Sequence, residues 1–387
     1  MSKKHPVFEK IVFIFQGGGA LGSYQAGVFQ ALHENGYEPD WIIGNSIGAM
    51  NASIIAGNNK EDWLNKLSEL WTVLSKPVPT GLLCDLDKKI PRTFYNYLSS
   101  QFTLWMRQTG FFYPRLQSPL LNIKDTVDKI SFYITDPLAE TLESLINFEI
   151  LNRGQPRLTL SAVDVHGGCP VYFDNTQEKL DYRHIMASGA LPPGFPAVKI
   201  GSNYYWDSGI LTNAPLERLM EECAKVNTLC FIVNLFDSQG LSPTSLDGVL
   251  KRHKDITYSS HYLYLLRNYR ENLRLRKAIN ALYNQLPFDV QEKAENKVYE
   301  KYSLNGAVMH FVHFIYQANH HELSSLDYDF SNISVKERFK DGYVDGLRAI
   351  QSKPWEQAVS EQEAIFLHEV HCHRDPINIW DEKNQFF

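Results

Sequence analysis

The most constraining feature of this chain is a glycine-flanked serine between a short apolar run and a stretch of small residues. The run Trp41-Ile42-Ile43 ends at Gly44, Ser46 follows, and Gly48 precedes Ala49-Met50-Asn51-Ala52. This order predicts a buried strand, a sharp turn and a helix, the arrangement known as a nucleophile elbow. Such a turn is crowded, so a side chain at Gly44 or Gly48 would collide with the neighbouring strand and helix backbones. The helix after Ser46 directs its unpaired N–H groups toward any anion that forms there.

A second glycine-rich segment precedes the elbow. The β-branched and aromatic run at 11–15 predicts a buried parallel strand, and Gly17-Gly18-Gly19-Ala20-Leu21-Gly22 follows it before a helical pattern. The spacing also fits a dinucleotide-binding loop, but that interpretation needs an acid at the end of the second strand. Asp40 comes too early for this role. The alternative use of such a loop is a row of bare backbone N–H groups that form an oxyanion hole.

A serine hydroxyl is a poor nucleophile without a base, and the sequence offers two kinds of base. The first is a carboxylate acting directly: Asp207 follows the predicted short strand 204–206 and precedes Ser208-Gly209. The second is a histidine of a Ser-His-Asp triad, which in α/β-hydrolases comes late in the chain. The late histidines are His310, His313, His320, His321, His368, His371 and His373, and none lies in a clear strand-end motif.

Alternating strand and helix patterns predict an α/β fold with a central, mostly parallel sheet flanked by helices. Apolar runs at 157–165 and 228–235 predict two further buried strands. Residues from about 62 to 156 show helical patterns broken by prolines, which predicts a helical insertion. This insertion either packs plainly on the sheet or forms a lid over an apolar acyl pocket.

The pattern of apolar and polar residues changes again near Gly240, where we place a domain boundary. Residues 8–240 contain every motif described above, and 241–387 are expected to form a mainly helical accessory domain whose role stays open. That segment has a long helical stretch at 247–286, a candidate strand at 308–316 and an amphipathic helix at 335–350.

Three motifs in this order resemble the patatin-like phospholipase family: Gly-Gly-Gly-Ala-Leu-Gly at 17–22, Gly-Asn-Ser-Ile-Gly-Ala at 44–49 and Trp-Asp-Ser-Gly at 206–209. Residues 187–192 and Asn213-Ala214-Pro215 also look like this family, so the match covers roughly 11–235. The combination is far more specific than any single motif. The resemblance implies the patatin-like three-layer fold, with 8–240 as its catalytic domain.

The resemblance also implies a mechanism, a Ser-Asp dyad without histidine that cleaves lipid acyl esters through an acyl-enzyme. By position, Ser46 is the nucleophile, Asp207 is the base, and Gly17, Gly18 and Gly19 form the oxyanion hole. Gly22, Gly44, Gly48 and Gly209 support the motifs. The family usually has glycine where this chain has Ser208. Two other functions stay open: an acyltransferase or triad esterase on a related fold, and a non-catalytic protein that binds nucleotide or lipid through the glycine loop.

Composition and the remaining motifs limit ligands and location. The net charge of −6 gives no reason to expect nucleic acid. His368-Glu369-Val370-His371-Cys372-His373 is rich in metal ligands but is not H-E-x-x-H, and on a helix its ligands would not share a face. We therefore expect no metal and no cofactor.

The apolar run after the N-terminal lysines is too short for a signal peptide, and five scattered cysteines suit a reducing compartment. We expect a cytoplasmic protein whose contact with membranes, where it occurs, is peripheral. The oligomeric state is open.

Overall fold

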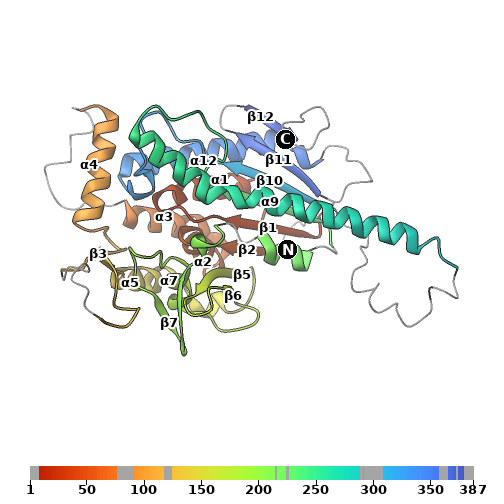
Figure 1. Cartoon of the computed structure of the whole chain (residues 1–387), viewed down its shortest axis with the longest axis horizontal. Coiled ribbons are helices and arrows are strands. Elements are labelled where there is room, and N and C mark those ends of the chain that lie inside the picture. Colours follow the sequence, from red (N-terminus) through yellow and green to blue (C-terminus); the bar gives the residue numbers. More distant parts are fainter. Residues whose placement is uncertain are drawn as a thin grey trace.

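A ten-stranded, mostly parallel sheet runs through the centre of the protein in the computed structural model (Figure 1). Its strand order is β12-β11-β10-β9-β1-β2-β5-β8-β7, and β6 pairs with residues Thr159–Val163 of β5 on the opposite edge of that strand. The six strands from β11 to β5 along this order are parallel, whereas β6, β7, β8 and β12 are antiparallel to their neighbours. The bounds are β1 Lys10–Phe15, β2 Trp41–Gly44, β5 Arg157–Asp164, β6 Pro170–Asp174, β7 Val198–Ile200, β8 Asn203–Asp207, β9 Thr228–Asn234, β10 Met309–Ile315, β11 Ile365–His371 and β12 Arg374–Asn378.

The structure describes residues 8–75, 90–116, 124–213, 216–223, 226–287, 291, 308–356, 365–371 and 374–378. The helices in these ranges are α1 Gly22–Glu34, α2 Ile47–Ala56, α3 Trp63–Leu74, α4 Arg92–Trp105, α5 Asp136–Leu145, α6 Phe148–Leu151, α7 Tyr182–Ser188, α8 Leu216–Cys223, α9 Leu246–Tyr283 and α12 Asn332–Ser352. Short 3-10 turns include η1 Gly19–Leu21 and η6 Leu326–Tyr328. A separate hairpin pairs β3 Tyr113–Pro114 with β4 Tyr133–Ile134. No helix of the described ranges combines the length and apolar composition needed to cross a bilayer.

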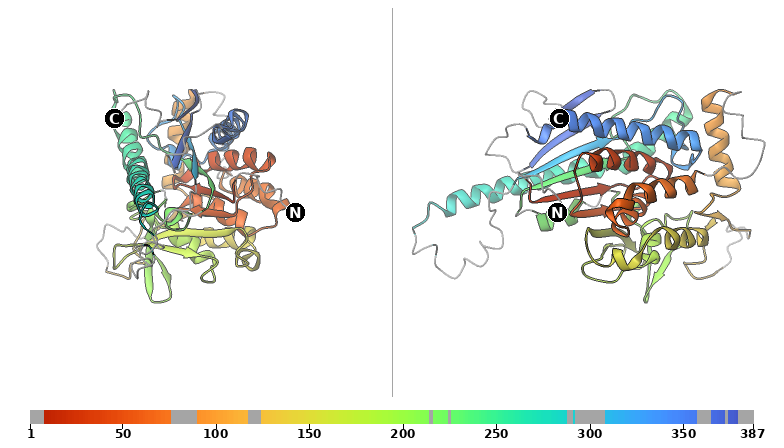
Figure 2. Two further views of the ribbon diagram at one scale, coloured as in Figure 1. Left: turned by 90° about the vertical axis from the view of Figure 1, so that its right-hand side faces the viewer. Right: turned by 180° about the vertical axis from the view of Figure 1, so that it is seen from behind.

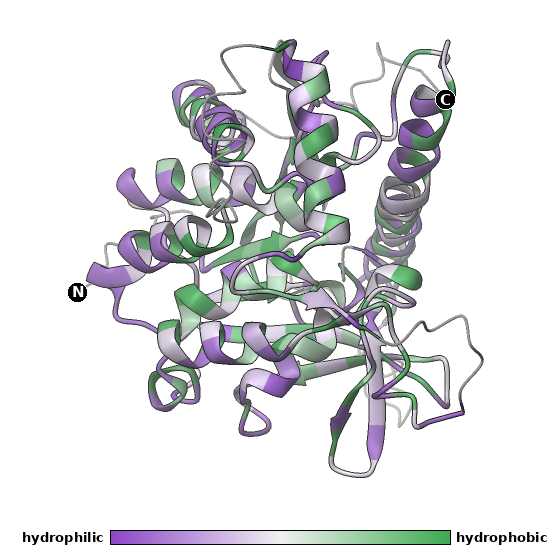
Figure 3. Cartoon of the chain, turned by 90° about the vertical axis from the view of Figure 1, so that its left-hand side faces the viewer, coloured by the Kyte–Doolittle hydropathy of each residue, from purple (hydrophilic) through white to green (hydrophobic). Residues whose placement is uncertain are grey.

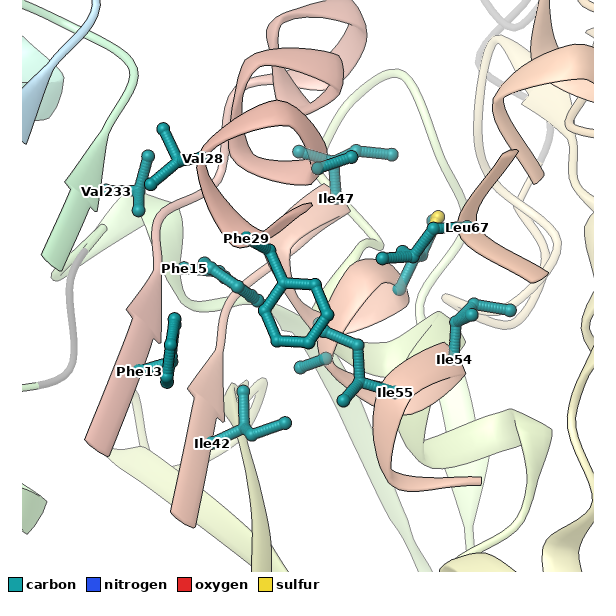
Figure 4. Packing of buried hydrophobic residues seen from close by; sticks show 14 of the residues in the cluster. Phe13, Phe15, Val28, Phe29, Ile42, Ile47, Ile54, Ile55, Leu67 and Val233 are labelled. Atoms are coloured by element: carbon teal, nitrogen blue, oxygen red, sulfur yellow. The ribbon is translucent and has the colours of Figure 1, made fainter. Parts of the chain in front are cut away.

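Helices cover both faces of the sheet, so the molecule has three layers (Figure 2). One face packs against α1, α2, α3 and α12, and its core contains the aromatic side chains Phe13, Phe15 and Phe29 (Figure 4). The opposite face carries Val12, Ile14 and Phe311 under α8 and α9. Side chains alternate between these two cores along β1, as the two-residue period of a strand requires. The predicted α/β architecture is therefore confirmed.

Two helices of the first layer, α1 and α12, approach each other closely enough that side chains are excluded between them. A Cβ atom on Gly27 would lie 2.0 Å from the Phe339 carbonyl oxygen, and one on Gly342 would lie 2.1 Å from the Tyr24 carbonyl oxygen. The contact brings the Tyr24 hydroxyl within 2.7 Å of the buried Asp345 carboxylate. Because α1 begins directly after the glycine loop, this packing connects that loop to residues more than 300 positions later.

Residues 241–387 are joined to the preceding part of the chain through one continuous sheet. β10 pairs with β9 over Met309–Ile315, β11 follows, and α12 lies on α1. The expected boundary near Gly240 therefore does not coincide with a division of the sheet. The predicted strand at 308–316 and the predicted helices at 247–286 and 335–350 are confirmed as β10, α9 and α12.

The ligand-rich segment at 368–373 was assessed above as a helix, and this was wrong, because its described part belongs to strand β11. Glu369 lies opposite Ile377 of β12, and Val312 of β10 lies opposite His368. Two consecutive polar positions, His368 and Glu369, obscured an apolar run that starts at Ile365. Cys372 and His373 lie outside the described residues.

Candidate active site

Ser46 lies on a strained turn between β2 and α2, as the elbow pattern predicts. Its backbone has φ 54° and ψ −123°, a conformation that non-glycine residues rarely adopt and that concentrates at functional sites. A Cβ on Gly44 would lie 2.7 Å from the Ala49 Cα, and a Cβ on Gly48 would lie 2.2 Å from the Phe15 carbonyl oxygen. Both collisions expected from the sequence, with the helix and with the neighbouring strand, are therefore present.

The glycine loop after β1 packs directly against the serine. A Cβ on Gly17 would lie 2.9 Å from the Ser46 Cβ, and one on Gly18 would lie 2.7 Å from the Leu235 side chain. Gly19 has φ +55°, and a Cβ there would lie 2.3 Å from the Asp327 carbonyl oxygen. A Cβ on Gly22 would lie 2.6 Å from the Ile47 Cγ1. The loop has no room for side chains, so its backbone lies open to a group bound beside Ser46.

Asp207 ends β8 on the same side of the sheet and is 2% exposed. Its Oδ1 accepts a hydrogen bond of 2.7 Å from the Gly209 N–H. Burial raises the pKa of Asp207 to about 6, against the opposing effect of hydrogen bonds from the Gly209 backbone and the Ser46 and Asn45 side chains. The structure thus brings Ser46 and Asp207 together, and burial raises the pKa of the carboxyl group above that of an exposed aspartate.

Ser208, the residue that departs from the usual family glycine, has a specific partner. Its hydroxyl donates a hydrogen bond of 2.6 Å to the Asn45 Oδ1 and lies 2.7 Å from the Ser161 hydroxyl. Gly209 follows it, and a Cβ there would make a tight contact of 3.1 Å with the Asp207 Oδ1. Asn45, the residue before Ser46, therefore provides a polar partner for the Ser208 hydroxyl.

These groups form the floor of a pocket whose walls are mostly aromatic. Ser46, Asp207, Asn213 and the three loop glycines line it together with apolar side chains from five other segments, namely Phe111, Phe112, Leu191, Phe195, Phe236, Tyr258, Tyr328 and Phe330. The aromatic rings contact one another, with centroids 5.5 Å apart for Phe111 and Phe195 and 6.0 Å apart for Phe111 and Phe330. An apolar cleft with a few convergent polar groups is the usual form of a small-ligand site.

Part of this wall comes from the C-terminal segment, which the sequence did not connect to the site. Asp327 and Tyr328 belong to η6, Phe330 follows them, and Tyr258 lies on α9. Lys254 of α9 forms a salt bridge of 2.6 Å with Asp327 and lies 4.7 Å from the centre of the Tyr328 ring. The aromatic content of these segments was a weak sequence signal, because no motif links them to the elbow.

A buried ion network holds this segment in place. Arg338 of α12 is 1% exposed and contacts the Glu322 carboxylate at 2.7 Å, while its Nη1 donates to the Asp329 carbonyl oxygen at 2.9 Å. Glu322 also accepts a hydrogen bond of 2.5 Å from the Tyr316 hydroxyl. Asp329 accepts hydrogen bonds from Ser99 of α4 at 2.7 Å and from Ser334 at 2.6 Å. The residues that precede α12 are therefore tied to α4, β10 and α12 together.

The alternative bases and ligands lie elsewhere. No histidine is found among the described residues that line the pocket. His310 and His368 form a buried pair on the sheet, with the His310 Nδ1 3.1 Å from the His368 Nε2. Burial lowers the pKa of His310 to about 4 and that of His368 to about 3. Asp40 accepts from the Ile11 N–H at the start of β1, the end remote from the glycine loop. Within the described ranges, no group of three or more histidine, cysteine or carboxylate side chains could hold a metal.

A parallel sheet with a serine on a tight strand-to-helix turn defines an α/β protein of the nucleophile-elbow type. Comparison with protein families makes this specific: a family model for patatin-like phospholipase matches residues 13–220, more than half of the chain. The chain belongs to the patatin-like phospholipase family. A second family model, described as patatin phospholipase, matches residues 256–362.

Individual relatives are more distant. "Triacylglycerol lipase ptl3" of Schizosaccharomyces pombe is 47% identical over 49 residues, which are 13% of this chain and 10% of that protein. The crystal structure of VipD from Legionella pneumophila is 16% identical with a TM-score of 0.38, covering 90% of this chain and 67% of that one. The complex of SpcU with ExoU from Pseudomonas aeruginosa gives 16% identity and a TM-score of 0.25, covering 64% and 48%. These scores are low, and family membership rests on the family model.

Proposed function

We propose that this protein is a serine lipid acyl hydrolase, similar to a phospholipase A or lysophospholipase, that uses a Ser46–Asp207 dyad and an acyl-enzyme. The observation that carries the proposal is the meeting of Ser46, Asp207 and the bare glycine loop on the floor of one aromatic pocket. Family membership supports the same class of reaction.

In the proposed reaction, the acyl ester lies along the aromatic wall with its carbonyl carbon beside the Ser46 hydroxyl. Asp207 accepts the hydroxyl proton as the Ser46 oxygen attacks, and the raised pKa of its carboxyl group makes it a stronger base for this transfer. The N–H groups of Gly17, Gly18 and Gly19 stabilise the oxyanion. Asp207 then returns the proton to the departing alcohol, and water activated by the same carboxylate releases the fatty acid from Ser46.

The pocket also suggests which part of the lipid enters it. Its described lining contains two carboxylates, Asp207 and Asp327, and no lysine, arginine or histidine. An anionic phosphate would therefore be unfavourable inside, and the proposal places only the acyl chain there, with the head group outside. A lipid panel of phospholipids, lysophospholipids and acylglycerols, with products measured by mass spectrometry, identifies the preferred head group and acyl position.

Exposed apolar side chains near the pocket support peripheral contact with a membrane. They occupy α4 and the β3–β4 hairpin, at the end of the molecule that faces the viewer in Figure 3. α4 contacts η6, and Phe132 beside the hairpin donates its N–H to Pro193 in the segment that carries Phe195. The members of this apolar rim are Phe94, Tyr97, Trp105, Met106, Tyr113, Ile130 and Phe132, which are 37–77% exposed.

Vesicle sedimentation tests the role of the rim. Trp105→Glu should weaken binding to lipid vesicles several-fold, because Trp105 is the most exposed member at 77%. Leu282→Glu is the matched control, since Leu282 is 65% exposed near the C-terminal end of α9, and that end of the helix lies opposite α4 in Figure 1. Equal binding by both variants and the unchanged protein would exclude the rim as the membrane contact.

Labelling with a fluorophosphonate probe tests the nucleophile. The unchanged protein and Ser202→Ala, an exposed serine in a strand turn, should label and hydrolyse ester equally, whereas Ser46→Ala should do neither. Labelling of Ser46→Ala at the original rate would show that another residue is the nucleophile. Adding an acceptor alcohol distinguishes hydrolase from acyltransferase, because a transferase yields a new ester instead of free acid. Tight NAD(P) or FAD binding without ester turnover would instead support the non-catalytic alternative.

A further inference from the structure

The side chain of Asn45, the residue before the elbow serine, lies at the centre of a buried hydrogen-bond network. It is fully buried, and its Nδ2 donates to the Asn213 Oδ1 at 3.0 Å. Its Oδ1 accepts from the Ser208 hydroxyl at 2.6 Å and from the Ser161 hydroxyl at 3.2 Å. Its hydrogen bond to Asp207 is one of the interactions that favour the ionised carboxylate.

The orientation of both side-chain amides in this network follows from one carbonyl group. The Gly17 carbonyl oxygen can only accept, and it receives the Asn213 Nδ2 at 3.1 Å. Asn213 must then present its Oδ1 to Asn45, so Asn45 must present its Nδ2. That orientation places the Asn45 amide nitrogen toward the acceptors and its oxygen toward the hydroxyl groups, with no freedom to exchange the two ends.

The network reaches all three parts of the proposed machinery. Through Asn213 it joins the start of the glycine loop, and through the Asn45 Nδ2 it contacts the Asp207 carboxylate. A third branch runs through Ser188, whose hydroxyl lies 3.5 Å from the Asn45 Oδ1 and accepts from the Ser46 N–H at 3.0 Å. Fully satisfied buried networks of this kind select a single arrangement of the groups they join.

We propose that Asn45 is a positioning residue that holds the Asp207 carboxylate toward Ser46 and, through Asn213, holds the glycine loop against the same serine. The inference rests on the proposed function and adds a residue that never touches substrate. Its consequence is that the N–H donor of Asn45, and not merely its volume, is required for turnover.

Asn45→Asp tests this requirement, because it keeps the size of the side chain and replaces the donor with an acceptor. The new carboxyl group would face the Asn213 oxygen and the Asp207 carboxylate, and a like charge raises a carboxyl pKa. Among the described residues, Tyr258 of α9 also interacts electrostatically with Asp207, and Asp327 lines the same pocket. We expect the acid limb of the kcat/KM profile to move up by about one pH unit or more, with kcat reduced at pH 7 and KM little changed.

Asn51→Asp is the matched control. Asn51 is also buried, lies on α2, and donates to the Gly22 carbonyl oxygen at 2.9 Å and to Gln25 at 3.0 Å. It contacts neither Asp207 nor Asn213 in these hydrogen bonds, so this substitution should lower the melting temperature without moving the acid limb. An acid limb that moves equally in both variants would mean that any buried charge in this core has the effect, and would overturn the assignment.

A second variant decides the matter if Asn45→Asp does not fold. Ser208→Ala removes the 2.6 Å donor that orients the Asn45 oxygen and should move the same limb in the same direction by a smaller amount. Folded variants with an unchanged limb and kcat would overturn the positioning role. Failure of the proposed function looks different, because the unchanged protein would then show no Ser46-dependent labelling or turnover at any pH.

Discussion

The floor and the walls of the pocket are built in different ways. The floor consists of residues from the first 57 positions and the β8 turn, held by backbone geometry and neutral hydrogen bonds. The wall formed by η6 and Phe330 is held by charges, through Lys254 with Asp327 and Arg338 with Glu322. This comparison indicates that the groups proposed to react, Ser46, Asp207 and the glycine loop, are held in position by the turns in which they lie. The groups that shape the cavity depend on ion pairs made elsewhere.

The two pocket carboxylates provide the strongest contrast between floor and wall. Asp207→Asn should reduce kcat by about 10,000-fold or more, because it removes the proposed base. Asp327→Asn should reduce kcat by no more than about tenfold, because its carboxylate is already paired with Lys254 and has no proposed chemical role. Steady-state kinetics on both variants measure this, and comparable losses would remove the distinction.

The buried arginine behind the wall should dominate stability. Arg338→Met leaves Glu322 and Asp329 buried without their cation and should lower the free energy of unfolding by about 3–5 kcal/mol. Lys340→Met removes an exposed cation from the same helix and should change that free energy by less than about 1 kcal/mol. Denaturant unfolding gives both values. An Arg338 variant as stable as the control would show that the network is not what holds the wall.

Floor and wall lie close together at Gly19. Gly19→Ala places a Cβ 2.3 Å from the Asp327 carbonyl oxygen and at positive φ, so it should displace the glycine loop and reduce kcat by roughly 100-fold. Gly201→Ala is the control, because Gly201 has φ +61° and nothing within 4 Å of the added atom. If both variants keep full activity, the loop does not need its observed position for turnover.

The sequence predicted the floor well because its information is local. The apolar runs that became β1, β2 and β9 each end at the residues that form or border the site, and turn glycines mark where those residues lie. Asp207 was identified for the same reason, as a carboxylate at a predicted strand end. Collisions at Gly44 and Gly48 follow from the turn alone and needed no knowledge of the rest of the chain.

The part of the wall formed by η6 and Phe330 could not be predicted, because its contacts join distant segments without a local motif. The Asp327 carbonyl reaches Gly19 across more than 300 positions, and Arg338 lies within an amphipathic helix pattern that gives no indication of a buried charge. One signal was available: Gly342 and Gly346 lie four residues apart on one face of that helix, which is compatible with a close helix contact. β11 was missed because the polar side chains His368 and Glu369 are buried within it.

The continuity of the sheet across Gly240 has a practical consequence for handling this protein. A chain cut after that residue would lose β10 and leave β9 at the edge of the sheet, with seven buried residues and a full row of unpaired backbone groups. Long, flat, apolar edges pair with other chains and promote aggregation. Residues 8–240, which contain the motifs described above, are therefore expected to be insoluble when expressed alone. Soluble expression is expected to require the strands on both sides of Gly240.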